Sequence, residues 1–369
     1  MNINKYFFII SIFFVGFIIA CDDGDENPSE TASFDRREML TNWADNIIVP
    51  AFINYRNYLQ NLVEAKDAFI LTPNESTYDS LTAAWLQAYK NWQHVSMFDI
   101  GKAESIGLRN FTNIYPTNNV LINENISSQV YNLELPSNFD AQGFPAIDYL
   151  LFGIGGSKEQ IIEQLSSDDH SQYLSDLINR LHTLTDTVTE DWLNSYSEEF
   201  INNDGSSATA SVDKVVNDFL FYYEKYLRAG KVGIPAGVFS GNKISSAVEA
   251  PYSGIHSKLL FLEGLEAVQN FFIGNHFEKG TRGISLKDYL DFVRPQNNDA
   301  DIATNIVDQW GSAISKTQGI SDNLKEQVET DNVKMLELYD ELQIAVVLMK
   351  VDMMQALNIQ VDYVDADGD

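Results

Sequence analysis

The sequence predicts an all-α fold, built from two packed helical bundles. Apolar residues recur at steps of three and four along most of the chain, which is the period of an amphipathic helix. No segment shows a convincing β-ladder pattern, and nine prolines and 21 glycines are too few for a β-sandwich rich in turns. With 44% hydrophobic and 12% aromatic residues, the chain can bury a large core.

The clearest predicted helix spans Leu81–Met97, in which Trp85 and Trp92 lie on one apolar face. Ser76 and Thr77 are candidate N-caps for this helix because their side chains can accept a hydrogen bond from a free backbone N–H. We expect both tryptophans to belong to the core of a bundle.

The remaining predicted helices follow in order along the chain. They span residues 34–69, 157–165, 173–196, 212–227, 257–272, 286–293, 301–317 and 331–357. Pro50 falls inside the first of these, where it should kink or divide the helix. Two short segments, residues 122–133 and 234–239, are weak candidates for extended structure.

The best internal break is the run Asn-Asn-Asp-Gly-Ser-Ser at residues 202–207. It predicts an N-terminal bundle over residues 35–204 and a C-terminal bundle over residues 205–369. A single continuous helical domain is the alternative. No short-period repeat is visible, so a solenoid is not expected.

The N-terminus has the pattern of a secretion signal, predicted over residues 1–20. Lys5 precedes an almost unbroken apolar run from Tyr6 to Ile19, too short to span a bilayer comfortably. The run ends in Ile-Ile-Ala-Cys, which resembles a lipobox, and Cys21 is the only cysteine of the chain. We therefore expect a lipid anchor at Cys21 that attaches the protein to a membrane. A plain secreted protein, cut at an Ala-x-Ala-like site, is the alternative.

Residues 21–34 form a predicted flexible tether that is rich in acidic side chains. The cluster that follows Cys21 resembles the export signal of Bacteroidetes lipoproteins, and an ordinary solvated leader is the alternative. The expected location is the cell envelope, as an outer-membrane lipoprotein that faces the periplasm or the surface. The whole chain has 53 acidic and 24 basic side chains, a net charge of -29, so nucleic acid is not an expected partner.

One segment, Gly143–Gly153, stands out for its chemistry. Pro145 suits the first turn of a helix, and Asp148 lies one turn later on the same face. Apart from Tyr149, Asp148 is the only ionisable residue in this apolar run. Such an aspartate either pairs with a partner such as Arg109 between helices, or it is a functional carboxylate with a shifted pKa.

This segment resembles the signature of the imelysin family, Gly-x-His-x-x-Glu followed by an apolar run that ends in Phe-Gly. Four further stretches resemble the family in the same order: residues 84–104 with their two tryptophans, 231–238, the Glu-Ala-Pro-Tyr-Ser element at 249–253, and the ending at 361–369. The resemblance covers the chain from about residue 36 onward.

The resemblance implies an all-helical protein of two bundle-like domains, with the signature near the cleft between them. It implies an envelope lipoprotein linked to iron acquisition, with iron or another divalent metal as ligand and iron-uptake envelope proteins as partners. The residues that it implies for the cleft are Gly143, Pro145, Asp148, Arg109, Glu249 and Ser253.

Two departures from the signature argue against a metal site of the kind that the family signature implies. Pro145 stands at the histidine position and has no donor atom for a metal, and Asp148 stands at the glutamate position with a side chain one methylene shorter. Asp148 remains the one candidate metal ligand in the signature. Elsewhere, His182 and Asp186 are four residues apart but lack a third ligand.

Other catalytic patterns are missing from the sequence. No His-Glu-x-x-His and no Gly-x-Ser-x-Gly occurs, and the lone cysteine belongs to the lipobox. The acidic ending at 365–369 is too short for a calcium loop and is expected to be a solvated tail. We therefore predict a non-catalytic binding lipoprotein that serves iron acquisition. A metallopeptidase of the imelysin type and a structural, partner-docking lipoprotein are the alternatives.

Overall fold

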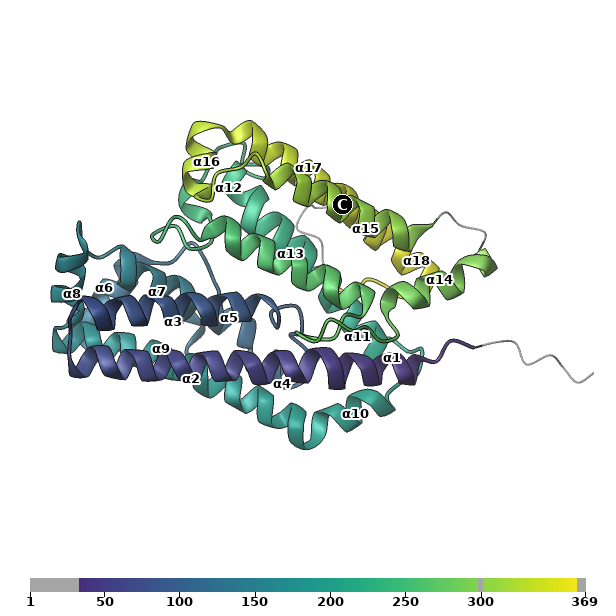
Figure 1. The fold of residues 1–369 in the computed structure, drawn as a ribbon, viewed down its shortest axis with the longest axis horizontal. Helices are drawn as coiled ribbons and strands as arrows, with labels where there is room; N and C mark the ends of the chain where they lie inside the picture. Colours follow the sequence, from purple (N-terminus) through teal and green to yellow (C-terminus); the bar gives the residue numbers. More distant parts are fainter. Residues whose placement is uncertain (1–32, 298–300, 364–369) are drawn as a thin grey trace, which may run out of the picture. The chain divides into compact units, whose positions relative to one another are not determined.

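Helices make up nearly all the regular structure of the computed structural model, which describes residues 33–297 and 301–363 (Figure 1). Within these residues the only extended pairing is an isolated bridge between Asn275 and Arg282. The all-α prediction is therefore confirmed. The two extended segments were wrong: α6 (Asn119–Ser128) occupies most of the first and the short α12 (Ile234–Ala236) begins the second.

Several predicted features lie outside the described residues. These are the signal peptide, the anchor at Cys21, the tether as far as residue 32 and the acidic tail from residue 364. Among the helices that the structure does describe, none combines the length and the apolar character needed to span a bilayer.

The first long helical run contains a π-helical segment just ahead of its proline. It consists of α1 (Arg36–Asn42), the π-helix η1 (Trp43–Ile48) and α2 (Val49–Leu71), with Pro50 in the first turn of α2. A proline has no N–H to donate to the carbonyl four residues before it. The Asn46 carbonyl instead accepts the backbone N–H of Phe277 at 2.8 Å. The run stays helical through Pro50, so the proline does not divide it, and the change in helix type falls in the residues just before it.

α3 (Glu75–Gln93) begins six residues before Leu81, where the sequence pattern placed the start of the helix. Its N-cap is Asn74, whose side chain accepts the backbone N–H groups of Ser76 and Thr77. Thr77 completes a capping box by accepting the N–H of Asn74. The candidate caps Ser76 and Thr77 are thus helical residues.

The rest of the first half surrounds α2 and α3. It comprises α4 (Lys102–Ile106), α5 (Leu108–Thr112), α6, the 3-10 helix η2 (Pro136–Ala141), α7 (Gly143–Phe152), α8 (Lys158–Leu165), α9 (Asp168–Asp191), the π-helix η3 (Trp192–Tyr196) and α10 (Ser197–Asn202). α2 packs against both α3 and α9, and these three helices form the first bundle (Figure 1).

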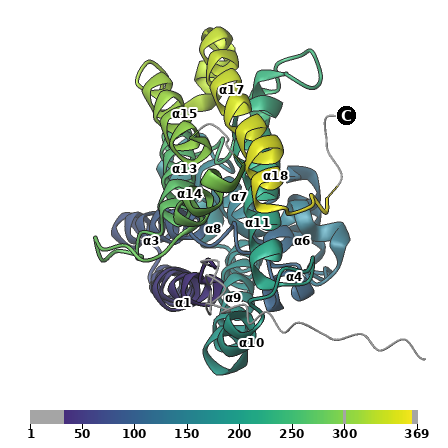
Figure 2. The ribbon, with the colours of Figure 1, turned by 90° about the vertical axis from the view of Figure 1, so that its right-hand side faces the viewer.

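The second half is also helical. It comprises α11 (Ser211–Phe221), the π-helix η4 (Tyr222–Gly233), α12, the 3-10 helix η5 (Ser245–Ala247), α13 (Ser257–Ile273), α14 (Leu286–Asn297), α15 (Ile302–Thr317), α16 (Leu324–Thr330), α17 (Asn332–Val347), the π-helix η6 (Leu348–Met353) and α18 (Met354–Leu357). α15 and α17 lie side by side, and α17 also packs on η4 (Figure 2).

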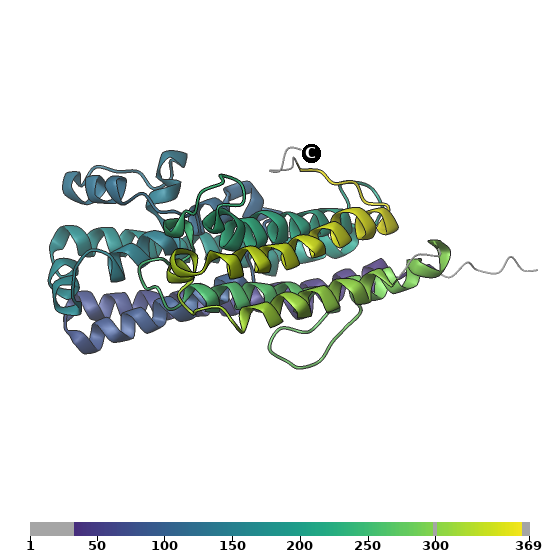
Figure 3. The ribbon, with the colours of Figure 1, turned by 90° about the horizontal axis from the view of Figure 1, so that it is seen from above.

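The two halves share a continuous contact. α13 packs on α3 of the first half as well as on η4 and α15 of the second, and the long helices of both halves run in a similar direction (Figure 3). All five tryptophans are buried, including Trp85 and Trp92, as predicted. Residues 35–369 form one unit by their contacts, so the domain boundary between residues 204 and 205 stays a prediction.

Candidate functional site

Helix α7 carries the signature segment and is buried from its first residue to Leu151. It begins at Gly143, whose φ of +73° belongs to the left-handed region that favours glycine. A Cβ atom at this position would lie 2.1 Å from the Thr112 carbonyl oxygen, so no other residue fits there. Pro145 lies in the first turn of α7, where its missing N–H breaks no helical hydrogen bond, as predicted.

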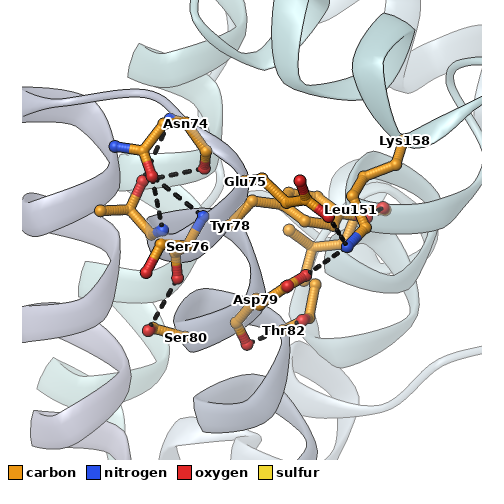
Figure 4. A network of polar contacts seen from close by, with 10 residues as sticks. Asn74, Glu75, Ser76, Tyr78, Asp79, Ser80, Thr82, Leu151 and Lys158 are labelled. Atoms are coloured by element: carbon orange, nitrogen blue, oxygen red, sulfur yellow. Dashed lines mark hydrogen bonds and ion pairs between the residues drawn. The ribbon is translucent and has the colours of Figure 1, made fainter.

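The other end of α7 is held by the start of α3 (Figure 4). The Tyr78 hydroxyl donates a hydrogen bond to the Leu151 carbonyl. Lys158, in the first turn of α8, forms ion pairs with Glu75 at 3.0 Å and Asp79 at 2.8 Å. The capping box of α3 thus fixes the residues that position the signature helix.

The carboxylate of Asp148 is fully buried and faces backbone N–H groups. Its Oδ2 accepts the N–H of Tyr252 at 2.9 Å, and its Oδ1 accepts the N–H of Ser253 at 3.0 Å. Burial raises the pKa of Asp148 to about 7, although the two N–H donors favour the ionised form. Asp148 therefore ties α7 to the segment Glu249–Ser253, which we call the 249–253 loop.

The 249–253 loop adopts a backbone that costs energy. Ala250 has a φ of +53°, which an alanine rarely adopts because its Cβ approaches a backbone oxygen. A conformation of this kind persists only when its surroundings fix it. Asp148 fixes one end of the loop and Glu249 fixes the other.

Glu249 lies at the centre of a buried set that we call the Glu249 cluster, which consists of Gln93, Asn113, Lys231 and Glu249. Oε1 of Glu249 accepts hydrogen bonds from the side-chain amides of Asn113 at 2.8 Å and Gln93 at 3.1 Å. Oε2 of Glu249 accepts a hydrogen bond from Lys231 Nζ. Lys231 also donates to Gln93 Oε1 at 2.9 Å. Burial lowers the pKa of Lys231, while the Glu249 carboxylate acts in the opposite direction. Every charge in the cluster is thus matched.

Arg109 pairs with Asp218 and not with Asp148, so the pairing considered from the sequence is corrected. Its Nη2 lies 2.9 Å from both carboxylate oxygens of Asp218, and its Nε donates to the Ser96 carbonyl at 2.9 Å. Asp99 lies 3.7 Å from Nη1. Burial raises the pKa of Asp218 to about 6, and Arg109 opposes that shift. Asp218 comes from α11 and carries no local sequence signal.

The expected cleft does not run past Asp148. The cavity beside the Glu249 cluster measures about 10 Å³, which is room for about one water molecule. Its walls include Gln93, Arg109, Asn113 and Lys231. Arg109 also lines a cavity of about 320 Å³ that includes Asp218. Gly143, Pro145, Asp148 and Glu249 are themselves buried, and Ser253 is half-buried. The signature residues therefore pack inside the protein.

A family model for imelysin, peptidase family M75, matches residues 48–346. This chain belongs to the imelysin family. A search of curated proteins finds no match.

Two crystal structures share the imelysin fold of this chain. One is from Parabacteroides distasonis ATCC 8503, named an iron-regulated protein A precursor, at 17% identity and a TM-score of 0.70; the match covers 87% of this chain and 96% of that one. The other is an imelysin-like protein from Psychrobacter arcticum 273-4, at 16% identity and a TM-score of 0.67; the match covers 89% of this chain and 97% of that one.

The imelysin signature of this chain does not fit a metal ion. Pro145 offers no donor atom, and both oxygens of Asp148 are engaged by N–H groups. Over the described residues, no three His, Cys, Asp or Glu side chains are grouped as ligands. Asp186, which the sequence places four residues after His182, forms an ion pair with Arg56 at 3.2 Å.

Proposed function

We propose that this imelysin-family protein is a non-catalytic binding protein, anchored in the cell envelope, that serves iron acquisition. The observation that carries the proposal is the position of Asp148. Its carboxylate is buried and both of its oxygens accept backbone N–H groups of the 249–253 loop. A carboxylate used in this way holds two segments together, and because Asp148 has no exposed surface it is not presented to a metal or a substrate.

The link to iron acquisition comes from the family and from one relative. The structure from Parabacteroides distasonis carries the name of an iron-regulated protein precursor. We carry this association to the present chain as part of the proposal, with an iron-uptake protein of the envelope as its partner. The anchor rests on Cys21 and the apolar run before it.

Peptidase activity is tested directly with purified protein. We expect neither insulin nor casein to be cleaved, with or without a chelator, because the signature lacks a metal-binding histidine and a free carboxylate. Cleavage that the chelator blocks and that Asp148→Ala abolishes, in a variant that still folds, would restore the metallopeptidase alternative.

The role in iron acquisition is tested by deleting the gene. Growth should fall when a chelator limits iron and should be normal in iron-replete medium, and the wild-type gene should restore it. Equilibrium dialysis against ferrous, ferric and zinc ions and haem then asks whether the protein itself binds the ligand. A growth defect without binding tighter than about millimolar favours the partner-docking alternative. Growth that does not depend on iron would contradict the proposal.

The anchor is tested with Cys21→Ser. The wild-type protein should incorporate labelled fatty acid and sediment with membranes, whereas the variant should do neither. External protease added to intact cells distinguishes the surface from the periplasmic face. Membrane association that survives the substitution would exclude a lipid anchor at this residue.

A further inference from the structure

A second cavity, away from the signature helix, has the size of a ligand site. It measures about 450 Å³, within the usual range for small-molecule pockets. Its walls come from η1 and the start of α2, the end of α3, the middle of α13, and the loop at residues 275–280. We call it the α13 cavity.

The loop that closes the α13 cavity is held by backbone hydrogen bonds. The Phe277 N–H fills the position at the Asn46 carbonyl that Pro50 leaves open, at 2.8 Å. The N–H of His276 donates to the Thr281 carbonyl at 2.8 Å. The loop side chains are therefore presented to the cavity by a fixed backbone, which reduces the entropy cost of binding.

The charge of the α13 cavity is negative. Glu263, Glu266 and Glu278 line it. Glu263 is matched by Lys90 at 2.8 Å and by His94 at 3.3 Å. Throughout the described residues, no lysine or arginine pairs with Glu266 or Glu278, which are exposed at the cavity. Glu278 Oε1 accepts one neutral hydrogen bond, from Asn54 Nδ2 at 3.4 Å. Two carboxylates are thus available to a bound cation.

The cavity also offers apolar and aromatic surface. Phe98 and Phe271 are buried in its wall, and Phe277 lies on its closing loop. His276 contacts the Thr281 hydroxyl through Nδ1 at 2.9 Å, whereas its Nε2 is shielded from solvent and has no hydrogen-bond partner in the described structure. The His276 ring is therefore part of the cavity wall and is held in place by Thr281.

We propose that the α13 cavity binds an organic cation that has a primary ammonium group next to an apolar chain. The carboxylates of Glu266 and Glu278 accept hydrogen bonds from the ammonium, and the phenyl rings contact the chain and stabilise the charge. The charge of the cavity disfavours anions. The lack of a three-ligand group among the described residues disfavours a metal ion. The inference is independent of the proposed function because it uses none of the signature residues.

Three probes with the same five-carbon chain test the head-group preference. We expect isothermal titration to show saturable binding of pentylamine, at least tenfold tighter than binding of pentanol, and no binding of pentanoate. N-acetyl-lysine methylamide, used in parallel, distinguishes a free amine from a lysine side chain of a peptide as the natural source. Equal binding of pentylamine and pentanol would overturn the proposal, as would displacement of pentylamine by micromolar ferrous or zinc ion.

A matched pair of double variants locates the site. Glu266→Gln with Glu278→Gln should weaken pentylamine binding at least tenfold. The control, Glu124→Gln with Glu134→Gln, makes the same change in net charge at exposed positions that do not line the cavity and should leave binding unchanged. Thermal unfolding confirms that both variants fold. If both pairs weaken binding equally, the effect is one of net charge and the site is refuted.

Discussion

At the scale of single residues, several buried charges of this imelysin-family protein are matched by partners that lie far away in the sequence. Asp148 accepts hydrogen bonds from Tyr252 and Ser253, which lie 104 and 105 positions later in the chain. Arg109 pairs with Asp218, which lies 109 positions later. Lys231 and Glu249 meet inside the Glu249 cluster, whose two amides come from the first half of the chain. A buried charge is tolerated only when it is paired, so each of these contacts is a specific constraint on the fold.

Asp148→Ala should destabilise the protein by about 2–4 kcal/mol at pH 6. The substitution leaves the buried N–H groups of Tyr252 and Ser253 without an acceptor, at about 1–3 kcal/mol each. Urea unfolding measures the loss. Asp45→Ala, at an exposed aspartate of η1, serves as the control and should change stability by less than about 0.5 kcal/mol. Equal effects of the two substitutions would contradict the role assigned to Asp148.

The contribution of Asp148 should also depend on pH. Its pKa is raised to about 7 in the folded protein, chiefly by burial, and is about 3.9 in an unfolded chain. Between these values the folded state retains a proton that the unfolded state has released. Its stabilising contribution is therefore complete in acid and declines as the pH rises to about 7. The stability difference between wild type and Asp148→Ala should shrink over this range, by at most ~1.4 kcal/mol per pH unit, and level off above it. A difference that grows with pH would contradict this sign.

The Lys231–Glu249 pair predicts strong coupling between its members. Lys231→Met or Glu249→Gln alone leaves one buried charge unmatched and should cost about 3–5 kcal/mol. The double variant leaves neither charge behind, so it should be more stable than the sum of the single effects implies, by at least ~1 kcal/mol. Urea unfolding of all four proteins provides the double-mutant cycle. Strict additivity would show that the pair does not interact.

At the scale of elements, helix periodicity was enough to find most of the helices, but their ends needed more information. The cap at Asn74 is seven residues ahead of Leu81, the first residue of the apolar repeat, so the pattern placed the start too late. The segment at 122–133 was misjudged because Ile122 and Ile126 are the only buried apolar residues of α6. Such a short amphipathic helix has too few apolar positions for its period to be distinguished from a strand.

The residues of the candidate site could also be predicted only in part. The signature resemblance found Asp148, Glu249 and Ser253, and the structure brings them together through the 249–253 loop. It could not give their partners, because the pairing of Arg109 with Asp218 depends on how α5 meets α11 in space. Neither residue has a sequence neighbour that signals the contact. Gln93 and Asn113, which complete the Glu249 cluster, were missed for this reason too.

The start of α7 gives a prediction for a single glycine. Gly143→Ala should destabilise the protein by more than ~1 kcal/mol, because it combines a left-handed backbone with a clash against the Thr112 carbonyl. The matched control is Gly311→Ala in α15, where an added Cβ meets nothing within 4 Å. That substitution should stabilise the protein by about 0.5–1 kcal/mol through helix propensity. Thermal unfolding compares them, and a neutral Gly143→Ala would refute the assigned role.

At the scale of the whole molecule, the two halves depend on each other for satisfied polar groups. Without residues 205–369, Asp148 loses its N–H donors and Arg109 loses Asp218. Gln93 and Asn113 lose the carboxylate between them. The helices of the first half would then contain charges without partners, and Trp43 and Phe98 would lose their contacts with Phe271.

A fragment of residues 35–204 should therefore fail to unfold cooperatively on its own. We expect weak tertiary structure by near-ultraviolet circular dichroism, because its buried charges lack partners. Addition of a fragment of residues 205–363 should restore the signal. A first fragment with a cooperative transition of nearly wild-type stability would instead support the two independent bundles that the sequence predicts.

The tie between Asp148 and the 249–253 loop has a consequence for biosynthesis. A chain that emerges amino end first exposes Asp148 about a hundred residues before its donors, at positions 252 and 253, leave the ribosome. The signature helix cannot reach its final state during that interval. The contact between α7 and the 249–253 loop can therefore form only after the second half of the chain has been made, so the folding of the signature helix waits for residues that are translated about a hundred positions later.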